Sequence, residues 1–201
     1  MKMCALLILL AIISIAPAFA DEPPEPCSIT SLDAVQRLLL IPADSPPNPL
    51  GSFTVTVLSD GNCIPIPHAA VEVLIGGLLD SKTHLCPSAV TLGYTDDRGE
   101  VVFNIPGGGC YKARSAVVIR ANGVEIREFH AVVSPDYAAW DNQGLPGKWN
   151  LRVGLPDFVA FATAFGRGVP SCHDYDNNGV TNVGDFALFG RFWAGGAQGC
   201  P

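Results

Sequence analysis

Basic residues are scarce in this chain, and their scarcity limits what it can bind. The 201 residues include 12 Lys and Arg against 19 Asp and Glu, a formal net charge of −7 at pH 7. A chain with this balance repels the phosphates of nucleic acids and anionic membrane surfaces. We therefore predict no nucleic-acid partner and no membrane association of the processed chain. A divalent cation such as calcium is a more natural partner.

Common catalytic signatures are also missing. The sequence has no HExxH, GxSxG or GxxxxGK motif, which argues against the usual metalloprotease, serine hydrolase and phosphate-binding loop classes. Neighbouring carboxylates such as Asp96 and Asp97 fall in a turn, whereas a glycosidase needs two acids facing each other across a cleft. The histidines are scattered and read as surface or strand residues: His68, His84, His130 and His173. We predict that the protein is not an enzyme, and a small secreted hydrolase stays an alternative.

Long apolar runs are confined to the first twenty residues. MKMCALLILLAIISIAPAFA carries Lys2, then an apolar stretch, then the small-residue ending Ala18-Phe19-Ala20. This order is typical of a secretory signal peptide over residues 1–20. The alternative is an uncleaved membrane anchor, because the apolar stretch approaches spanning length. The signal peptide predicts a secreted protein, extracellular or on the cell surface.

The cysteines lack the spacing of a zinc site. No CxxC pair occurs, and no histidine pair has ligand spacing, so zinc is not favoured. Seven cysteines are present, and Cys4 falls within the signal peptide. The remaining six are an even number in an exported chain, which predicts disulfides. Among the possible pairings we favour three: Cys172 with Cys200, Cys86 with Cys110, and Cys27 with Cys63.

Residues 21–50 read as an acidic, proline-rich segment followed by a short helix. DEPPEP is too rich in proline and acid to pack. In SITSLDAVQRLLLIP, Ser31 is a candidate N-cap and Pro42 a candidate stop. Apolar residues at helical spacing lie between them: Leu32, Val35, Leu38 and Leu39. We predict a short helix that docks on the following region.

Residues 51–133 change to a period of two, which is typical of strands. The expected strand segments are FTVTVLS, AAVEVLI, EVVFNI, SAVVIRA and VEIREFHAVV. TDDRGE and ANGVE supply glycine-containing turns, and PGGGC at residues 106–110 reads as a loose turn beside a disulfide. This region resembles the immunoglobulin-like and carboxypeptidase-regulatory-like β-sandwich modules of secreted proteins. The resemblance implies an antiparallel β-sandwich.

Residues 134–201 contain an internal repeat. LPDFVAFATAFG and VGDFALFGRFW match at an offset of 28 residues. Each copy places an aspartate at the start of a helix and aromatic side chains at i, i+3 and i+7 along one helix face. The matched residues are Asp157, Phe158, Phe161 and Phe165 in one copy and Asp185, Phe186, Phe189 and Trp193 in the other. We expect two helices that bury their aromatic faces against each other.

The second copy is preceded by a calcium-loop pattern. With Asp174 as position 1, the candidate ligands at positions 1, 3, 5, 7, 9 and 12 are Asp174, Asp176, Asn178, Val180, Asn182 and Asp185. Gly179 falls at position 6, where the EF-hand loop turns sharply, and Val180 would contribute its carbonyl. The alternative is an Asn- and Asp-rich surface turn that caps a helix. Because every ligand position carries an oxygen, the spacing predicts a calcium site.

A calcium loop that ends in aspartate, is followed by one helix and is repeated in tandem resembles the dockerin type I module. That family has paired loop–helix repeats, binds one calcium per loop and docks by its helices onto cohesin modules that assemble secreted polysaccharide-degrading complexes. The resemblance covers residues 134–201. It implies calcium as the cofactor and a cohesin-like or surface protein as the partner.

The sequence departs from the dockerin pattern in two places. Counting back from Asp157 puts Pro146, Lys148 and Asn150 at positions 1, 3 and 5 of the first loop, which cannot chelate as a set. That site is therefore lost, or rebuilt with Asp136 or Asp141. The family's hydroxyl pair at positions 10 and 11 is also replaced, by Leu155-Pro156 in one copy and Val183-Gly184 in the other.

These patterns together predict a mainly β protein with a small α module. An antiparallel β-sandwich is followed by a two-helix dockerin-like calcium module, and the expected function is non-catalytic extracellular protein–protein assembly, linked through the resemblance to polysaccharide degradation. An accessory carbohydrate-binding protein stays an alternative. In that alternative the sandwich grips glycan through Tyr94, Tyr111 or Phe129.

Overall fold

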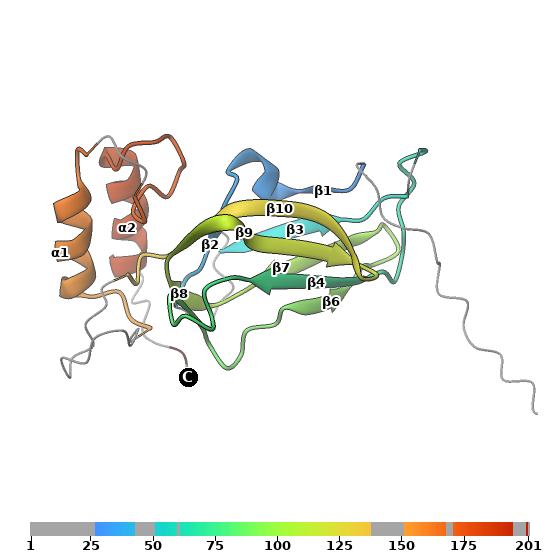
Figure 1. The fold of residues 1–201 in the computed structure, drawn as a ribbon, viewed down its shortest axis with the longest axis horizontal. Coiled ribbons are helices and arrows are strands. Elements are labelled where there is room, and N and C mark those ends of the chain that lie inside the picture. The colour runs from blue at the N-terminus through green and yellow to red at the C-terminus, as the bar shows by residue number, and fades with distance from the viewer. Residues whose placement is uncertain are drawn as a thin grey trace, which may run out of the picture.

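A computed structural model describes residues 27–42, 51–59, 61–137, 151–167, 171–194 and 200. This part of the chain is mainly β, with two helices, α1 (Leu155–Ala164) and α2 (Val183–Ala194), that lie side by side at one end of the molecule (Figure 1). None of the helices in the described residues is long and apolar enough to cross a membrane. The predicted signal peptide and the DEPPEP segment lie outside the described residues.

Within the described residues, ten strands form three sheets. The strands are β1 (Ile29–Thr30), β2 (Leu38–Leu39), β3 (Ser52–Thr56), β4 (Ala70–Ile75), β5 (Thr83–Leu85), β6 (Leu92–Tyr94), β7 (Glu100–Asn104), β8 (Gly107–Gly109), β9 (Tyr111–Ala121) and β10 (Val124–Val133). The sheet orders are β1-β3-β7, β2-β10-β9-β4-β6 and β5-β8. All named pairs are antiparallel except β2 with β10.

The period-two alternation of residues 51–133 produces strands with one buried face. Val71, Val73 and Ile75 of β4 are buried while Glu72 is exposed, so the strand presents its apolar face to the core. Phe53 of β3 stacks on Phe103 of β7 with ring centroids 5.5 Å apart. Side chains from the three-stranded and five-stranded sheets share one core cluster. All five strand segments predicted from the sequence are confirmed.

The predicted N-terminal helix is wrong in extent. Only a single 3₁₀ turn forms, η1 (Ser31–Ala34), and Thr30 rather than Ser31 caps it by accepting the Leu32 amide at 3.3 Å. At Gln36 the backbone takes a φ of 55°, which ends helical geometry. The chain then enters β2, where Leu38 pairs with Val132 of β10. Pairing with β10 decides the conformation of this segment, and local sequence propensity does not indicate that pairing.

The glycines of PGGGC form a buried strand instead of a loose turn. Strand β8 consists of Gly107, Gly108 and Gly109, which pair with β5 and are all buried. A side chain on Gly108 would overlap the Asp136 carboxylate, and Gly109 has a φ of 103°. Glycine is needed because other chain atoms approach the backbone closely. The disulfide expected beside this segment is present at Cys110.

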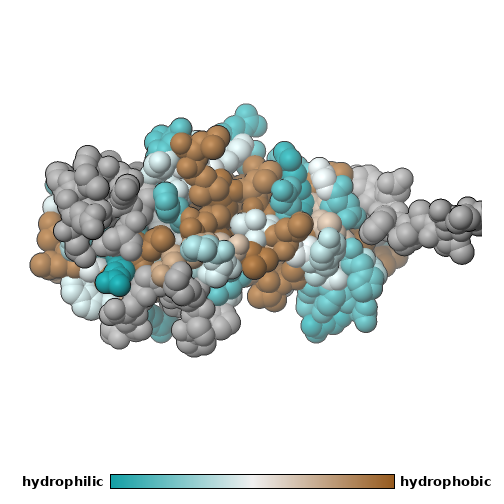
Figure 2. Space-filling view, turned by 90° about the horizontal axis from the view of Figure 1, so that it is seen from below, coloured by the Kyte–Doolittle hydropathy of each residue, from teal (hydrophilic) through white to brown (hydrophobic). Residues whose placement is uncertain are grey.

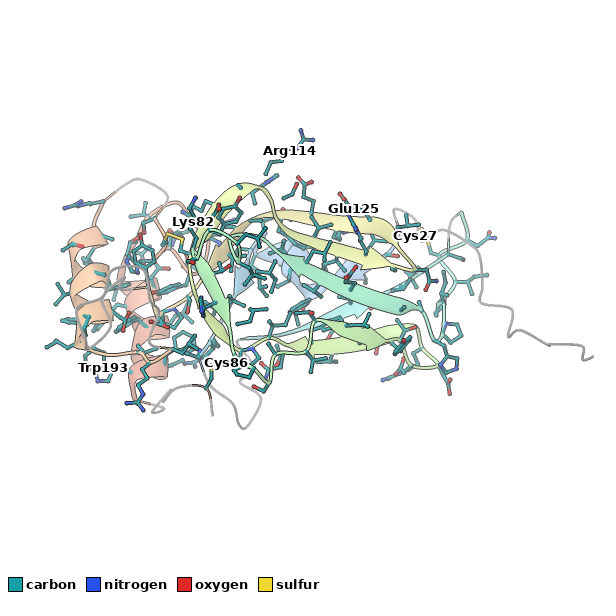
Figure 3. The ribbon with its side chains drawn as sticks, turned by 60° about the horizontal axis from the view of Figure 1, so that its bottom comes forward. Cys27, Lys82, Cys86, Arg114, Glu125 and Trp193 are labelled. Atoms are coloured by element: carbon teal, nitrogen blue, oxygen red, sulfur yellow. A yellow bond between two sulfur atoms is a disulfide. The ribbon has the colours of Figure 1, made fainter. Side chains whose placement is uncertain are left out.

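Two of the three predicted disulfides are wrong. Cys27–Cys63 is confirmed, and the other pairs are Cys86–Cys200 and Cys110–Cys172. Cys86 and Cys110 cannot bridge each other because they lie at opposite ends of the β5–β8 ladder: the Cys86 amide bonds the Pro106 carbonyl, whereas the Cys110 amide bonds the Lys82 carbonyl. Figure 3 shows Cys86 at the end of the β region near the helices and Cys27 at the far end. Two bridges therefore tie the C-terminal third to the β region.

The surface does not present the three aromatic rings expected of a glycan site. Phe129 is 1% exposed within the core, and Tyr111 is half-buried beside Gly76 and Gly77. Tyr94 is exposed, at 64%. Hydrophobic residues on the face in Figure 2 gather over the middle of the β region, and hydrophilic residues gather toward the end away from the helices. The three rings do not form one binding platform.

Candidate metal centre

The two helices of the repeat pack through their central aromatic rings. Phe161 of α1 and Phe189 of α2 stack with centroids 5.3 Å apart, and both are 1% exposed. The outer rings stay at the surface, with Phe165, Phe186 and Trp193 each between 43% and 50% exposed. The expected burial of the aromatic faces is therefore met at the centre of the helix pair and not at its edges.

Three acidic side chains converge where the loop after Cys172 meets the first turn of α2. Carboxylate oxygens of Asp174, Asp176 and Asp185 lie within 4.8 Å of one another. Asp174 and Asp185 are buried, and Asp176 is exposed. They occupy positions 1, 3 and 12 of the predicted loop. Because hard cations take carboxylate and carbonyl oxygens, this donor set fits calcium.

Backbone amides hold the Asp174 carboxylate in place. The amide of Asn178 donates to its Oδ1 and that of Gly179 to its Oδ2, both at 3.1 Å. The chain turns sharply here, with φ of 61° at Asn177 and 89° at Gly179. Asparagine and glycine adopt these angles more readily than other residues. Gly179 thus lies at the sharp turn that the loop pattern requires.

Asp185 joins the loop to α2. Its Oδ1 accepts the amides of Tyr175 at 2.5 Å and Asp176 at 3.3 Å, and its Oδ2 accepts the amide of Asn182 at 2.9 Å. The bond from Asn182 satisfies a donor that the N-terminus of α2 leaves unpaired, and the bonds from Tyr175 and Asp176 fix the start of the loop to the helix. The helix begins two residues before Asp185, at Val183, so the prediction that the aspartate starts the helix is wrong by two residues.

The other three predicted ligands lie on the same loop and use their polar atoms locally. Asn178 accepts the Val180 amide through Oδ1 at 2.9 Å and donates through Nδ2 to Asp176 at 2.9 Å. Asn182 accepts the Gly184 amide at 2.7 Å and donates to the Val180 carbonyl at 3.3 Å. In this arrangement their oxygens serve the hydrogen bonds of the loop itself.

Arg37, for which the sequence predicted no role at this site, reaches the loop from the N-terminal segment. Its Nη2 lies 3.6 Å from Asp174 Oδ2 and donates to Asn177 Oδ1. Burial lowers the pKa of Arg37, and the charges of Asp174, Asp185 and Asp176 oppose that shift. No local pattern reveals the contact, because Arg37 and Asn177 are 140 residues apart in sequence.

Buried aromatic and titratable groups underlie the loop. His173 is 3% exposed and meets Tyr137 edge to face with ring centroids 4.8 Å apart, so its expected surface position is wrong. Burial, helped by the charge of Lys112, lowers the pKa of His173 to about 4. Burial also raises the pKa of Asp185, which its backbone donors oppose and the charge of Asp176 reinforces. His173 is therefore neutral at pH 7.

No protein-family model, curated protein or solved structure matches the chain.

The first copy of the repeat keeps one corresponding aspartate, Asp157, and a second buried aspartate, Asp136, lies near it. Asp157 accepts the amides of Tyr137 at 3.0 Å and Gly154 at 2.8 Å, as Asp185 does with Tyr175 and Asn182. Asp136 is 1% exposed, and within the part of the chain that the structure describes neither of its carboxylate oxygens has a hydrogen-bond partner. The other residues proposed for this loop lie outside the described residues: Asp141, Pro146, Lys148 and Asn150.

The buried Asp136 predicts a pH-dependent stability. Burial, reinforced by the charge of Asp157, raises the pKa of Asp136 to about 8, and the nearby Leu151 amide only partly opposes this. The unfolded chain releases this proton near pH 4, so the folded state binds more protons between about pH 4 and pH 8. Stability from this group is complete below pH 4 and is lost as the pH rises through that window.

We expect Asp136→Asn to remove that decline. In chelator, the variant should gain on the wild type as the pH rises from 4 to 8, reaching a difference on the order of a few kcal/mol at pH 8. Urea unfolding at pH 4, 6 and 8 measures the difference. Parallel pH profiles for the two proteins would show that Asp136 does not titrate in this window.

Proposed function

We propose that this is a secreted, non-catalytic protein in which one calcium ion stabilises a helical docking module. The observation that carries the proposal is the convergence of Asp174, Asp176 and Asp185 within 4.8 Å, at the start of α2. Three carboxylates at this separation repel one another, and a cation removes the repulsion. The ion would be held by six residues: Asp174, Asp176, Asn178, Val180, Asn182 and Asp185.

The surrounding fold supports an extracellular module of this kind. Disulfides persist mainly in oxidising compartments, and three are present. We interpret the two larger sheets, which share one core, as an immunoglobulin-like β-sandwich. The loop–helix repeat keeps its resemblance to dockerin type I, and that resemblance points to a cohesin-like or surface protein partner and to polysaccharide degradation.

The helix pair offers a surface for such a partner. A groove of about 420 Å³ lies between α1 and α2, lined by Leu155, Phe158, Phe186, Phe189, Gly190 and Trp193. Phe158 and Trp193 meet edge to face there with ring centroids 5.7 Å apart. Figure 3 places Trp193 at the helical end of the molecule. Aromatic residues in a concave apolar surface are typical of protein interfaces.

Calcium should raise the thermal unfolding midpoint. At about 100 times its dissociation constant, an ion that binds only the folded state adds about 2.7 kcal/mol. For a chain of this size, that gain corresponds to about 5 to 10 °C. Differential scanning calorimetry of the purified extracellular chain, in calcium and in chelator, measures the shift.

Asp176→Ala should abolish most of this shift, because it removes one exposed candidate ligand while leaving the amide bonds of Asp174 and Asp185 in place. Asp97→Ala is the matched control, since its side chain is exposed and far from the loop in sequence. It should keep the full shift. Equal midpoints in calcium and chelator for the wild type would contradict the proposed calcium site.

The docking role is tested separately. Phe186→Ser with Trp193→Ser should keep the calcium-induced shift, because neither side chain contributes to the loop. The double variant should lose calcium-dependent capture of extracellular proteins by the immobilised chain. Capture that is unchanged in the double variant, or equal in calcium and chelator, would remove the groove from the proposed function.

A further inference from the structure

Arg37 is fixed on the β region and reaches into the candidate calcium loop. It lies between η1 and β2, and Leu38, the next residue, pairs with Val132 of β10. Its side chain is 4% exposed, and that of Asp174, which it contacts at 3.6 Å, is 1% exposed. Because the backbone next to Arg37 is held by the sheet and its guanidinium faces a buried carboxylate, its charge is part of the electrostatics of the candidate metal centre.

The hydrogen bonding of Arg37 is incomplete. Nη2 interacts with Asp174 and Asn177, whereas Nε and Nη1 have no hydrogen-bond partner among the described residues. A buried guanidinium in this condition is stabilised mainly by nearby negative charge. That charge comes from Asp174, Asp185 and Asp176. Arg37 thus depends on the same three carboxylates that the ion would use.

A calcium ion and Arg37 therefore compete. Both are cations attracted to the Asp174 carboxylate, and at this range two positive charges repel each other strongly in a partly buried setting. Lys112 is close enough to feel the charges of both Arg37 and Asp174, and so adds to the positive charge nearby. Arg37 also lines a cavity of about 210 Å³ with Tyr175, Asp176 and Leu188, which gives its side chain room to withdraw.

We propose that Arg37 is a tethered counter-ion of the loop that lowers its calcium affinity and links ion binding to the contact between the N-terminal segment and the loop. This inference rests on the proposed function. By thermodynamic reciprocity, calcium weakens the Arg37 contact by the same factor by which the contact weakens calcium binding. Without calcium, Arg37 partly neutralises the carboxylates and keeps the loop closed. With calcium, the contact with Asp174 is weakened.

Calorimetric titration of the full chain with calcium tests this competition. Arg37→Met removes the charge at similar length and should tighten calcium binding about tenfold. Arg37→Lys keeps the charge and should stay within about threefold of the wild type. Arg98→Met is the matched control, because Arg98 is exposed and pairs with Asp96 and Glu100 in a turn. Its affinity should equal that of the wild type.

A second variant protects the test against misfolding of Arg37→Met. Asn177→Gly removes the side-chain acceptor of Arg37 on an exposed position and keeps the positive φ of 61° accessible. It should also tighten calcium binding. If the wild type binds calcium and neither Arg37→Met nor Asn177→Gly binds it more tightly, the inference about Arg37 is overturned. The proposed function would still stand. Absence of calcium binding in the wild type and every variant would overturn both.

Discussion

Replacing Asp185 with alanine is expected to lower the free energy of unfolding by about 3 to 5 kcal/mol in calcium and by about 2 kcal/mol in chelator. The larger figure combines two losses. One is the hydrogen-bond acceptor of the amides of Tyr175, Asp176 and Asn182. The other is the ligand at position 12 of the loop. Urea unfolding under both conditions separates them, because only the ligand role depends on calcium.

Asp157→Ala is the matched control for this prediction. Asp157 accepts the amides of Tyr137 and Gly154 in the first copy, so its loss should destabilise the chain to a similar extent in chelator. It should leave the calcium-dependent gain intact, because Asp157 is not in the Asp174–Asp185 loop. Equal effects of Asp185→Ala in calcium and in chelator would show that Asp185 is a helix cap and not a ligand.

The second large effect is expected from the disulfide that anchors the loop. Cys110 and Cys172 are 62 residues apart in sequence, and Cys172 lies two residues before Asp174. A disulfide of this span restricts the unfolded chain and so raises the free energy of unfolding by about 4 kcal/mol. We expect Cys110→Ala with Cys172→Ala to lose that amount and also to weaken calcium binding, because the start of the loop is no longer fixed to the junction of β8 and β9. Urea unfolding and calcium titration measure the two effects.

Cys27→Ala with Cys63→Ala is the control pair. Their separation of 36 residues gives a similar entropic loss of about 4 kcal/mol. Figure 3 shows Cys27 at the end of the β region away from the helices, so calcium affinity should not change. If both pairs lowered calcium affinity equally, general destabilisation and not loop anchoring would be the cause.

Local sequence patterns predicted the elements whose conformation is decided locally. Alternation in AVEVLI fixed the buried face of β4, and Asn122-Gly123 supplied the positive φ of the β9–β10 turn. The spacing of Asp174, Asp176 and Asp185 predicted carboxylates that the structure brings together. In each case, neighbours within a few residues carry the information.

Elements decided by distant contacts were missed. Leu38 joins β10 and does not continue a helix, because the sheet edge beside Val132 accepts it. The glycines of β8 are buried since Asp136 and β5 approach their backbone, which nothing in PGGGC reveals. Arg37 meets the metal loop across 140 residues of sequence. Contacts of this kind depend on the assembled fold, and periodicity does not report them.

Calcium titration of the wild-type chain by isothermal calorimetry tests the central claim most directly. Binding of one ion per chain at micromolar to millimolar calcium, lost in Asp176→Ala, is the predicted result. No heat of binding at millimolar calcium would contradict it and leave the three aspartates as the hydrogen-bonding frame of a helix-capping turn.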